Sequence, residues 1–206
     1  MKTLDLRKKL KVLYTPSAKE AMLVDVPPMT FACVDGRGDP NSADFQTALG
    51  ALYSFSYTFK FLVKKELSLD FPVMASEGLW GVEGKADFAQ GNYNRRDAWR
   101  WTLMMMQPDE AGTELWPVAL EQVARRGTAG LERLRFERFE EGRSAQIMHI
   151  GPYATEPATV ARLHAFIASQ GLRPRGRHHE IYLGNPLRAA PEKLKTILRH
   201  PVEPAR

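Results

Sequence analysis

The chain has 206 residues, of which 44% are hydrophobic and 26% are charged, and its formal net charge is +5. That length is enough to bury a substantial core. The basic residues are spread along the chain without a helix-turn-helix, zinc-finger or RNA-recognition pattern, so we expect no nucleic-acid partner. The sequence has no run of about 18 apolar residues and no signal-peptide core, so we expect a cytoplasmic protein with no membrane partner.

The sequence offers little support for a metal or a cofactor. Cys33 is the only cysteine, which excludes an intrachain disulfide and a cysteine-built zinc site. Its apolar neighbours predict a core residue. His178, His179 and Glu180 stand in a row, but adjacent residues of a strand face opposite ways, so we expect no metal. Dinucleotide, P-loop and serine-hydrolase fingerprints are missing, and we expect no cofactor.

The first half of the chain predicts a strand, a helix and further strands. Asn41 or Ser42 can cap the helix, whose apolar residues recur every three, four or seven positions. Trp99, Trp101 and Leu103 alternate as in a strand with one buried face. In chain order we expect an arm at 1–24, a strand at 29–35, a turn at 36–41, the helix, a strand at 70–74, a polar loop at 85–94 and a strand at 99–103.

The second half predicts a similar series. In the segment 177–186, Glu180 and Tyr182 are two residues apart in a β-branched and aromatic run, so they project from one face with His178 beside them. In chain order we expect a helical connector broken near Pro117, a hairpin of strands at 134–139 and 145–150, a helix capped at Thr155 and ended by Gly171, the strand at 177–186 and a short helix at 191–198.

The two halves form an imperfect internal repeat, in which 36–77 corresponds to 151–180. We therefore predict one domain with an α+β fold, built from tandem strand-helix-strand-strand units at 25–108 and 131–206, with 109–130 as the connector. The units are expected to have pseudo-two-fold symmetry, with antiparallel sheets, helices on one face and a ligand cleft between the halves.

We expect this cleft at the symmetry axis, where the matching strands meet. Its lining would be Glu77 and Trp80 from the first half, and Glu180 and Tyr182 from the second. Alternation points Glu77 and Trp80 opposite ways, so both can line one cleft only if Gly78 forms a bulge.

Several motifs, in order along nearly the whole chain, resemble the GyrI-like (DNA gyrase inhibitor-like) small-molecule-binding family, within it the stand-alone, full-length branch. These motifs are Val26-Pro27, the turn from Asp35 to Asn41, Leu52-Tyr53, Tyr57 to Lys60, Glu77 to Trp80, Trp99 to Trp101, Gln107 to Asp109, Glu141-Gly142, Gln146 to Tyr153 and His178 to Leu183.

The resemblance implies a duplicated fold with an aromatic cleft that binds flat, often cationic, drug-like molecules. In the stand-alone branch it also implies hydrolysis of cyclopropane-containing genotoxins, which is a detoxification. In one departure, Gly81 stands where relatives carry a second aromatic residue, which indicates a more open cleft wall.

Water can open a cyclopropane fused to a dienone if a base takes its proton and a donor meets the carbonyl oxygen. We interpret Glu180 as the base and Glu77 as a second acid or water-orienting group. The donor is expected among Tyr182, Tyr57, Tyr153 and the indole N–H of Trp80.

The walls that hold a planar or cationic ligand are expected to be mainly aromatic. The predicted ligand-binding residues are Tyr53, Tyr57, Trp80, Trp99, Trp101, His149, Tyr153 and His178. Trp99 and Trp101 also fit core spacing. His149 alternates with Ile147, which favours a hydrogen-bonded structural histidine over an acid or base.

Two other functions stay open at this point. One is a binding protein that sequesters hydrophobic or cationic molecules without altering them, because a carboxylate among aromatics suits cation binding too. The other is a protein-interaction role such as direct inhibition of gyrase, for which the sequence offers only the family name.

Overall fold

The computed structural model describes residues 1–82, 96–184 and 188–205. Within them the strands are β1 (Lys2–Thr3), β2 (Met22–Val26), β3 (Met29–Arg37), β4 (Leu69–Asp70), β5 (Ser76–Val82), β6 (Trp99–Gln107), β7 (Arg135–Phe139), β8 (Gly142–Ile150), β9 (Leu172–Pro174), β10 (His178–Tyr182) and β11 (Lys195–Pro204). The α-helices are α1 (Leu6–Lys9), α2 (Lys11–Tyr14), α3 (Ala43–Leu67), α4 (Trp116–Ala124) and α5 (Glu156–Ser169). Short 3₁₀ turns include η5 (Tyr153–Thr155) and η6 (Pro191–Lys193). The predicted loop at 85–94 lies outside the described residues.

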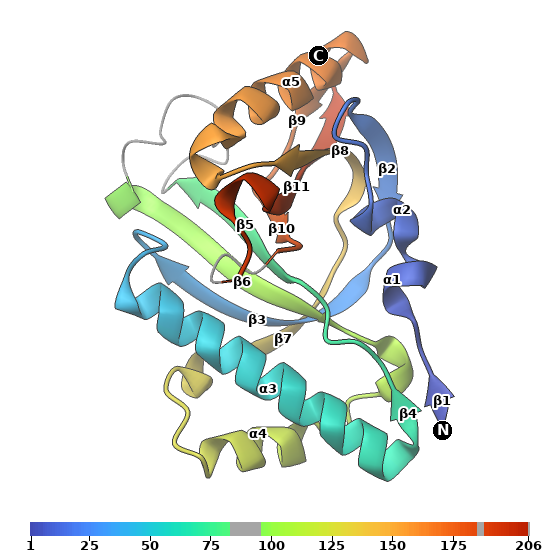
Figure 1. Cartoon of the computed structure of the whole chain (residues 1–206), viewed down its shortest axis with the longest axis vertical. Helices are drawn as coiled ribbons and strands as arrows, with labels where there is room; N and C mark the ends of the chain where they lie inside the picture. The colour runs from blue at the N-terminus through green and yellow to red at the C-terminus, as the bar shows by residue number, and fades with distance from the viewer. Residues whose placement is uncertain (83–95, 185–187, 206) are drawn as a thin grey trace.

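One large antiparallel sheet organises the fold, in the order β2-β8-β11-β10-β5-β6-β3-β7, with β9 paired to β11 (Figure 1). The units β3-α3-β5-β6 and β8-α5-β10-β11 follow the same order of elements. Their matching strands β5 and β10 pair antiparallel at the centre, with Gly78 opposite Glu180. The predicted α+β fold with pseudo-two-fold symmetry is confirmed.

Each half also contributes a strand to the other half. β2 pairs with β8, and β7 pairs with β3. The predicted hairpin of 134–139 with 145–150 is therefore wrong. Phe136 on β7 packs on Phe55 of α3 and on Trp116 of α4, with ring centroids 4.9 and 3.9 Å away, and this contact holds β7 beside β3.

The C-terminal segment is a central strand and not a helix. Pro191 begins only the short turn η6, and β11 then pairs with β10 on one side and with β8 on the other. Ile197 and Leu198 are both fully buried, on opposite faces of the sheet. A strand buried on both faces has no polar alternation, so its sequence is easily mistaken for a helix.

The helices α3 and α5 cover the same face of the sheet. Ser42 caps α3, because its hydroxyl accepts a hydrogen bond of 3.3 Å from the Phe45 amide. Apolar residues of α3 pack on Trp101 and Leu103, and those of α5 pack on Ile147 and Leu198.

The opposite face is covered by the N-terminal arm. Leu6, Leu13 and Tyr14 of the arm join a buried cluster with Leu79 and Ile181 of the central strands. In Figure 1 the helices α1 and α2 of the arm, drawn in dark blue, lie beside β2. None of the helices among the described residues is long and apolar enough to cross a membrane.

Candidate functional site

Glu180 lies at the centre of the helix-covered face, on the strand next to the symmetry axis. Its Oε2 accepts a hydrogen bond of 2.8 Å from the Tyr182 hydroxyl, which in turn accepts one of 2.9 Å from the Trp80 indole N–H. Its Oε1 lies 3.3 Å from Nε2 of the buried His178. The Glu180 side chain is 14% exposed. A chain of polar contacts therefore joins the two halves of the molecule at one carboxylate.

Gly78 makes room for this chain of contacts. A Cβ atom at this position would lie 2.8 Å from Nε1 of Trp80 and 3.0 Å from the Tyr182 hydroxyl. Pairing of β5 with β10 continues without interruption from Ser76 to Trp80, so Gly78 forms no bulge. The glycine is needed for space.

Aromatic rings surround Trp80 and Tyr182. Phe45 of α3 stacks on Trp80 at 5.9 Å between ring centroids, and Trp99 contacts Trp80 edge-on at 5.6 Å. Tyr153 contacts the Tyr182 ring edge-on at 6.0 Å. We call Trp80, Trp99, Tyr153, Glu156, His178, Glu180 and Tyr182 the acidic–aromatic cluster.

Two further tyrosines of α3 extend the aromatic surface. Tyr53 donates a hydrogen bond of 3.3 Å to the Ser76 hydroxyl at one end of β5. Tyr57 is 49% exposed and stacks on Tyr53 with 6.3 Å between ring centroids. Trp101, in contrast, is 1% exposed, and its ring occupies the space that a side chain at Gly36 would need, so it is a core residue.

The phenols of the acidic–aromatic cluster are neutral at physiological pH. Burial and then the negative charge of Glu180 raise the pKa of Tyr182 well above its usual value. Burial, followed by the charges of Glu156 and Glu180, raises the pKa of Tyr153 to about 12. Both hydroxyls are therefore hydrogen-bond donors near neutral pH.

Glu156, the first residue of α5, is the member that the sequence did not reveal. Its side chain is buried, and its Oε1 atom has no hydrogen-bond partner among the described residues. Burial and the charge of Glu180 raise its pKa to about 9, although a hydrogen bond with Thr196 acts in the opposite direction. An acidic residue in the first turn of a helix is ordinary at the sequence level, because it complements the helix dipole.

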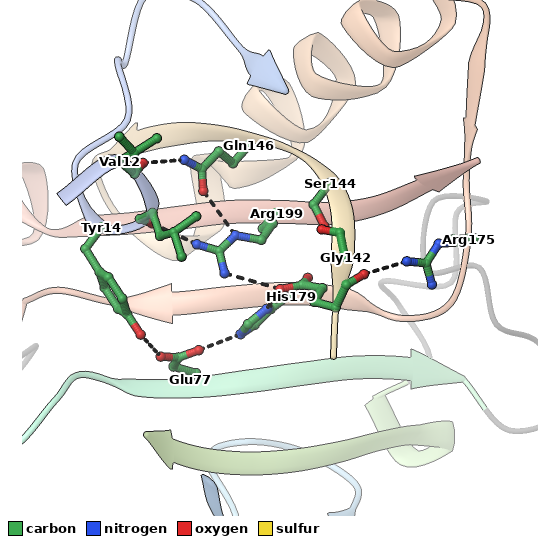
Figure 2. Close-up of polar contacts among 11 residues, drawn as sticks. Val12, Tyr14, Glu77, Gly142, Ser144, Gln146, Arg175, His179 and Arg199 are labelled. Carbon is green, nitrogen blue, oxygen red and sulfur yellow. Dashed lines mark hydrogen bonds and ion pairs between the residues drawn. The ribbon is translucent and has the colours of Figure 1, made fainter. Parts of the chain in front are cut away.

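Glu77 does not belong to the acidic–aromatic cluster, so the prediction that it shares a cleft with Glu180 is wrong. Without a bulge at Gly78, alternation turns Glu77 to the face that the arm covers. There it is fully buried, accepts a hydrogen bond of 2.7 Å from the Tyr14 hydroxyl and lies 2.9 Å from Nε2 of His179 (Figure 2).

The contacts of Glu77 continue into a buried polar network behind β10. His179 Nδ1 lies 3.0 Å from Oε2 of Glu141, which also accepts a hydrogen bond of 3.2 Å from Arg199. Arg199 donates to the carbonyl oxygen of Leu13 at 2.7 Å. Gln146 joins Arg199 to the carbonyl oxygen of Val12, as Figure 2 shows. Two acids are thus matched by two bases, and the network fastens the arm to the central strands.

His179 is an imidazolium in this setting. Burial alone would lower its pKa, but the charge of Glu141 and hydrogen bonds with Glu141 and Glu77 raise it to about 9. Burial likewise opposes ionisation of Glu141, yet the charges of His179 and Arg199 lower its pKa to about 2. The paired charges compensate for the cost of burying each one.

Gly81 is also placed differently from what the sequence suggested, and His149 fits the structural alternative instead of a ligand-binding role. A side chain at Gly81 would point to the arm-covered face, where the stem of Arg177 lies 3.5 Å from the position of its Cβ. Gly81 therefore does not open the wall near Trp80. His149 is buried under α5 and bonds Thr159 at 2.9 Å, as a structural histidine does.

A separate hollow of about 640 Å³ opens near the end of β3. Its lining is Asp35, Gly36, Arg37, Asp44, Arg100, Trp101, Thr102, Arg133 and Arg177. Arg133 pairs with Asp44 at 2.9 Å, and Asp35 is paired with Arg135. No cluster of metal-binding side chains occurs in the part of the chain that the structure describes.

Comparison with known proteins places the chain in a family. The model of the GyrI-like small molecule binding domain matches residues 19–203. An uncharacterized conserved protein from Listeria innocua is 40% identical, with a TM-score of 0.86 over 97% of this chain and 100% of the other. No curated protein sequence matches the chain.

Two further solved structures, with similar TM-scores, are named hydrolases, and both are from Listeria innocua. One is 39% identical, with a TM-score of 0.85 over 98% of this chain and 100% of the other. The second is 37% identical, with a TM-score of 0.83 over 97% and 100%. The resemblance seen in the sequence is confirmed, and the chain belongs to the GyrI-like family of small-molecule-binding domains.

Proposed function

We propose that this protein binds planar aromatic molecules, cationic ones among them, at the acidic–aromatic cluster and hydrolyses cyclopropane-containing genotoxins there. The observation that carries the proposal is the Glu180 carboxylate, which is largely buried, anchored by Tyr182 and bordered by aromatic rings. The hydrolase names of the two Listeria innocua proteins support a hydrolytic activity.

In the proposed reaction Glu180 acts as the general base. It takes a proton from a water molecule, whose oxygen bonds to a cyclopropane carbon while the ring bond to that carbon breaks. The electron pair of the broken bond passes through the dienone to its carbonyl oxygen, which becomes a phenolate. Return of the proton from Glu180 to the phenolate completes the addition of one water.

Tyr153 is our candidate for the donor to the developing phenolate. The proton of Tyr182 is committed to Glu180, and the indole proton of Trp80 is committed to Tyr182. Tyr153 is 41% exposed and lies against Tyr182, and its raised pKa keeps the hydroxyl protonated. A neutral phenol can stabilise the growing negative charge by a hydrogen bond.

A binding protein that leaves its ligand unchanged is the second candidate, and it is favoured by the family description of a small-molecule-binding domain. Incubation with a cyclopropane-containing dienone, followed by mass spectrometry, separates the two. The hydrolase converts the compound to a product heavier by one water. Binding measured by tryptophan fluorescence without any change in mass would establish the binder.

The role of Glu180 is tested by Glu180→Gln, which keeps the shape of the side chain but removes the base. We expect turnover to fall by about 10²-fold to 10⁴-fold, as for loss of a general base. Glu192→Gln is the matched control, because Glu192 is exposed in η6 and takes part in none of the hydrogen bonds and ring contacts described for the acidic–aromatic cluster. Equal turnover in Glu180→Gln and the parent would exclude this mechanism.

A further inference from the structure

Glu156 is a buried acid for which the proposed reaction has no use. It is 7% exposed, and its Oε1 atom has no hydrogen-bond partner among the described residues. An ionised carboxylate in such a position is unfavourable unless a partner compensates it. The N-terminus of α5 favours the charged form, but the influence of a helix dipole is modest compared with burial.

The side chain of Glu156 reaches β11 next to the position of Tyr182. It shares a hydrogen bond with Thr196, which lies directly opposite Tyr182 in the register of β10 and β11. The charge of Glu156 acts on Tyr153 and Tyr182, and that of Glu180 acts on Glu156. Two carboxyl groups, one from α5 and one from β10, therefore act on the same part of the helix-covered face.

The titratable groups that face this pair among the described residues include no lysine or arginine. On the elements packed about the start of α5 they are Glu180, Tyr182 and His178 on β10, His149 on β8, His200 on β11, Tyr153 in η5 and Tyr53 on α3. Burial and the neighbouring histidines lower the pKa of His200 to about 3, so it stays neutral. Two ionised carboxylates would repel each other there, and one proton shared by the pair removes the repulsion.

We propose that Glu156 is a second ligand-binding acid, which carries a proton in the ligand-free protein and releases it to solvent when a cationic ligand binds beside Glu180. A neutral ligand would leave the proton in place. The pair would thus adjust its charge from one negative charge to two, and this adjustment lets one aromatic site accept neutral and cationic molecules. The inference rests on the proposed binding function and identifies the residue that adapts the site to the ligand's charge.

Proton release can be measured directly by isothermal titration calorimetry at pH 7.5 in two buffers that differ in ionisation enthalpy, phosphate and Tris. The probes are ethidium, a planar aromatic cation, and acridone, a neutral planar compound. We expect the parent protein to release close to one proton for each bound ethidium and none for each bound acridone. Glu156→Gln should bind ethidium without release, and Glu192→Gln should behave as the parent does.

Each other outcome overturns a defined part of the proposal. Ethidium binding to the parent without proton release, or the same release from Glu156→Gln, would overturn the role of Glu156 and leave the proposed function intact. Failure of both ethidium and acridone to bind the parent would overturn the proposed binding function and this inference with it. The measurement on the parent protein decides the matter even if the variant is unstable.

Discussion

Glu180 and His179 are adjacent in the chain, yet their side chains lie on opposite faces of β10. Glu180 belongs to the acidic–aromatic cluster under α3 and α5. His179 belongs to the buried polar network that fastens the N-terminal arm. The strand β10 therefore carries side chains of two separate polar sites, one on each face of the sheet.

The space beside Gly78 is expected to control the position of Tyr182. In Gly78→Ala the new methyl group would lie 2.8 Å from Nε1 of Trp80 and 3.0 Å from the Tyr182 hydroxyl. These distances are too short, so the hydrogen bond between the two side chains must lengthen or break. We expect about a tenfold or larger loss of ligand affinity or turnover, because a small displacement of a binding group is costly.

Gly81→Ala is the matched control, on the same strand but on the opposite face. Its methyl group would meet the stem of Arg177 at 3.5 Å, which is an ordinary contact. Ligand affinity, followed by tryptophan fluorescence, should therefore stay within about twofold of the parent. Equal affinities for the parent and Gly78→Ala would show that the Trp80–Tyr182 contact does not position the ligand.

The sequence predicted the elements whose signals are local. Alternation correctly placed Glu180, Tyr182 and His178 on one face, and the internal repeat led to the pairing of β5 with β10. It did not reveal the exchange of β2 and β7, because strand partners distant in the sequence leave no local pattern.

Two side chains show where sequence reasoning stops. Alternation alone turned Glu77 away from Trp80, but the sequence held no sign of its partners, since Tyr14 and His179 are distant along the chain. Glu156 looked like an ordinary acid in the first turn of a helix. Only the fold shows that Glu156 is buried and lies under the influence of the Glu180 charge instead of facing solvent.

The charge of His179 should make the stability of the protein depend on pH. Because its pKa is raised from 6.5 to about 9 in the folded protein, its contribution to stability is complete below about pH 6.5 and is lost as the pH rises through about 9. We expect the free energy of unfolding, measured with urea, to fall over this range by at most about 1.4 kcal/mol per pH unit from this group. Glu141 acts at the other end, with a contribution lost as the pH falls from 4.5 through about 2.

His179→Gln isolates the effect of the imidazolium. It leaves the buried carboxylates of Glu77 and Glu141 with one base fewer, so we expect a loss of about 3–5 kcal/mol at pH 6 and a flatter profile between pH 6.5 and 9. If the variant does not fold, the slope of the parent protein alone is decisive. A parent stability that is constant from pH 6.5 to 9 would contradict the assignment.

The hydroxyl of Tyr14 should hold the N-terminal arm on the sheet. It donates a hydrogen bond of 2.7 Å to Glu77, and Tyr14→Phe would leave that oxygen buried without its donor. We expect a loss of about 1–3 kcal/mol in urea unfolding. Amide exchange in residues 6–14 should also become faster, because less free energy then opposes undocking of α1 and α2.

Tyr57→Phe, at an exposed tyrosine of α3, is the control and should change neither measurement. Unchanged stability and exchange in Tyr14→Phe would mean that the Tyr14 hydroxyl does not hold the arm, which is then held by its apolar packing and by the contacts of Arg199 and Gln146 with its carbonyl groups.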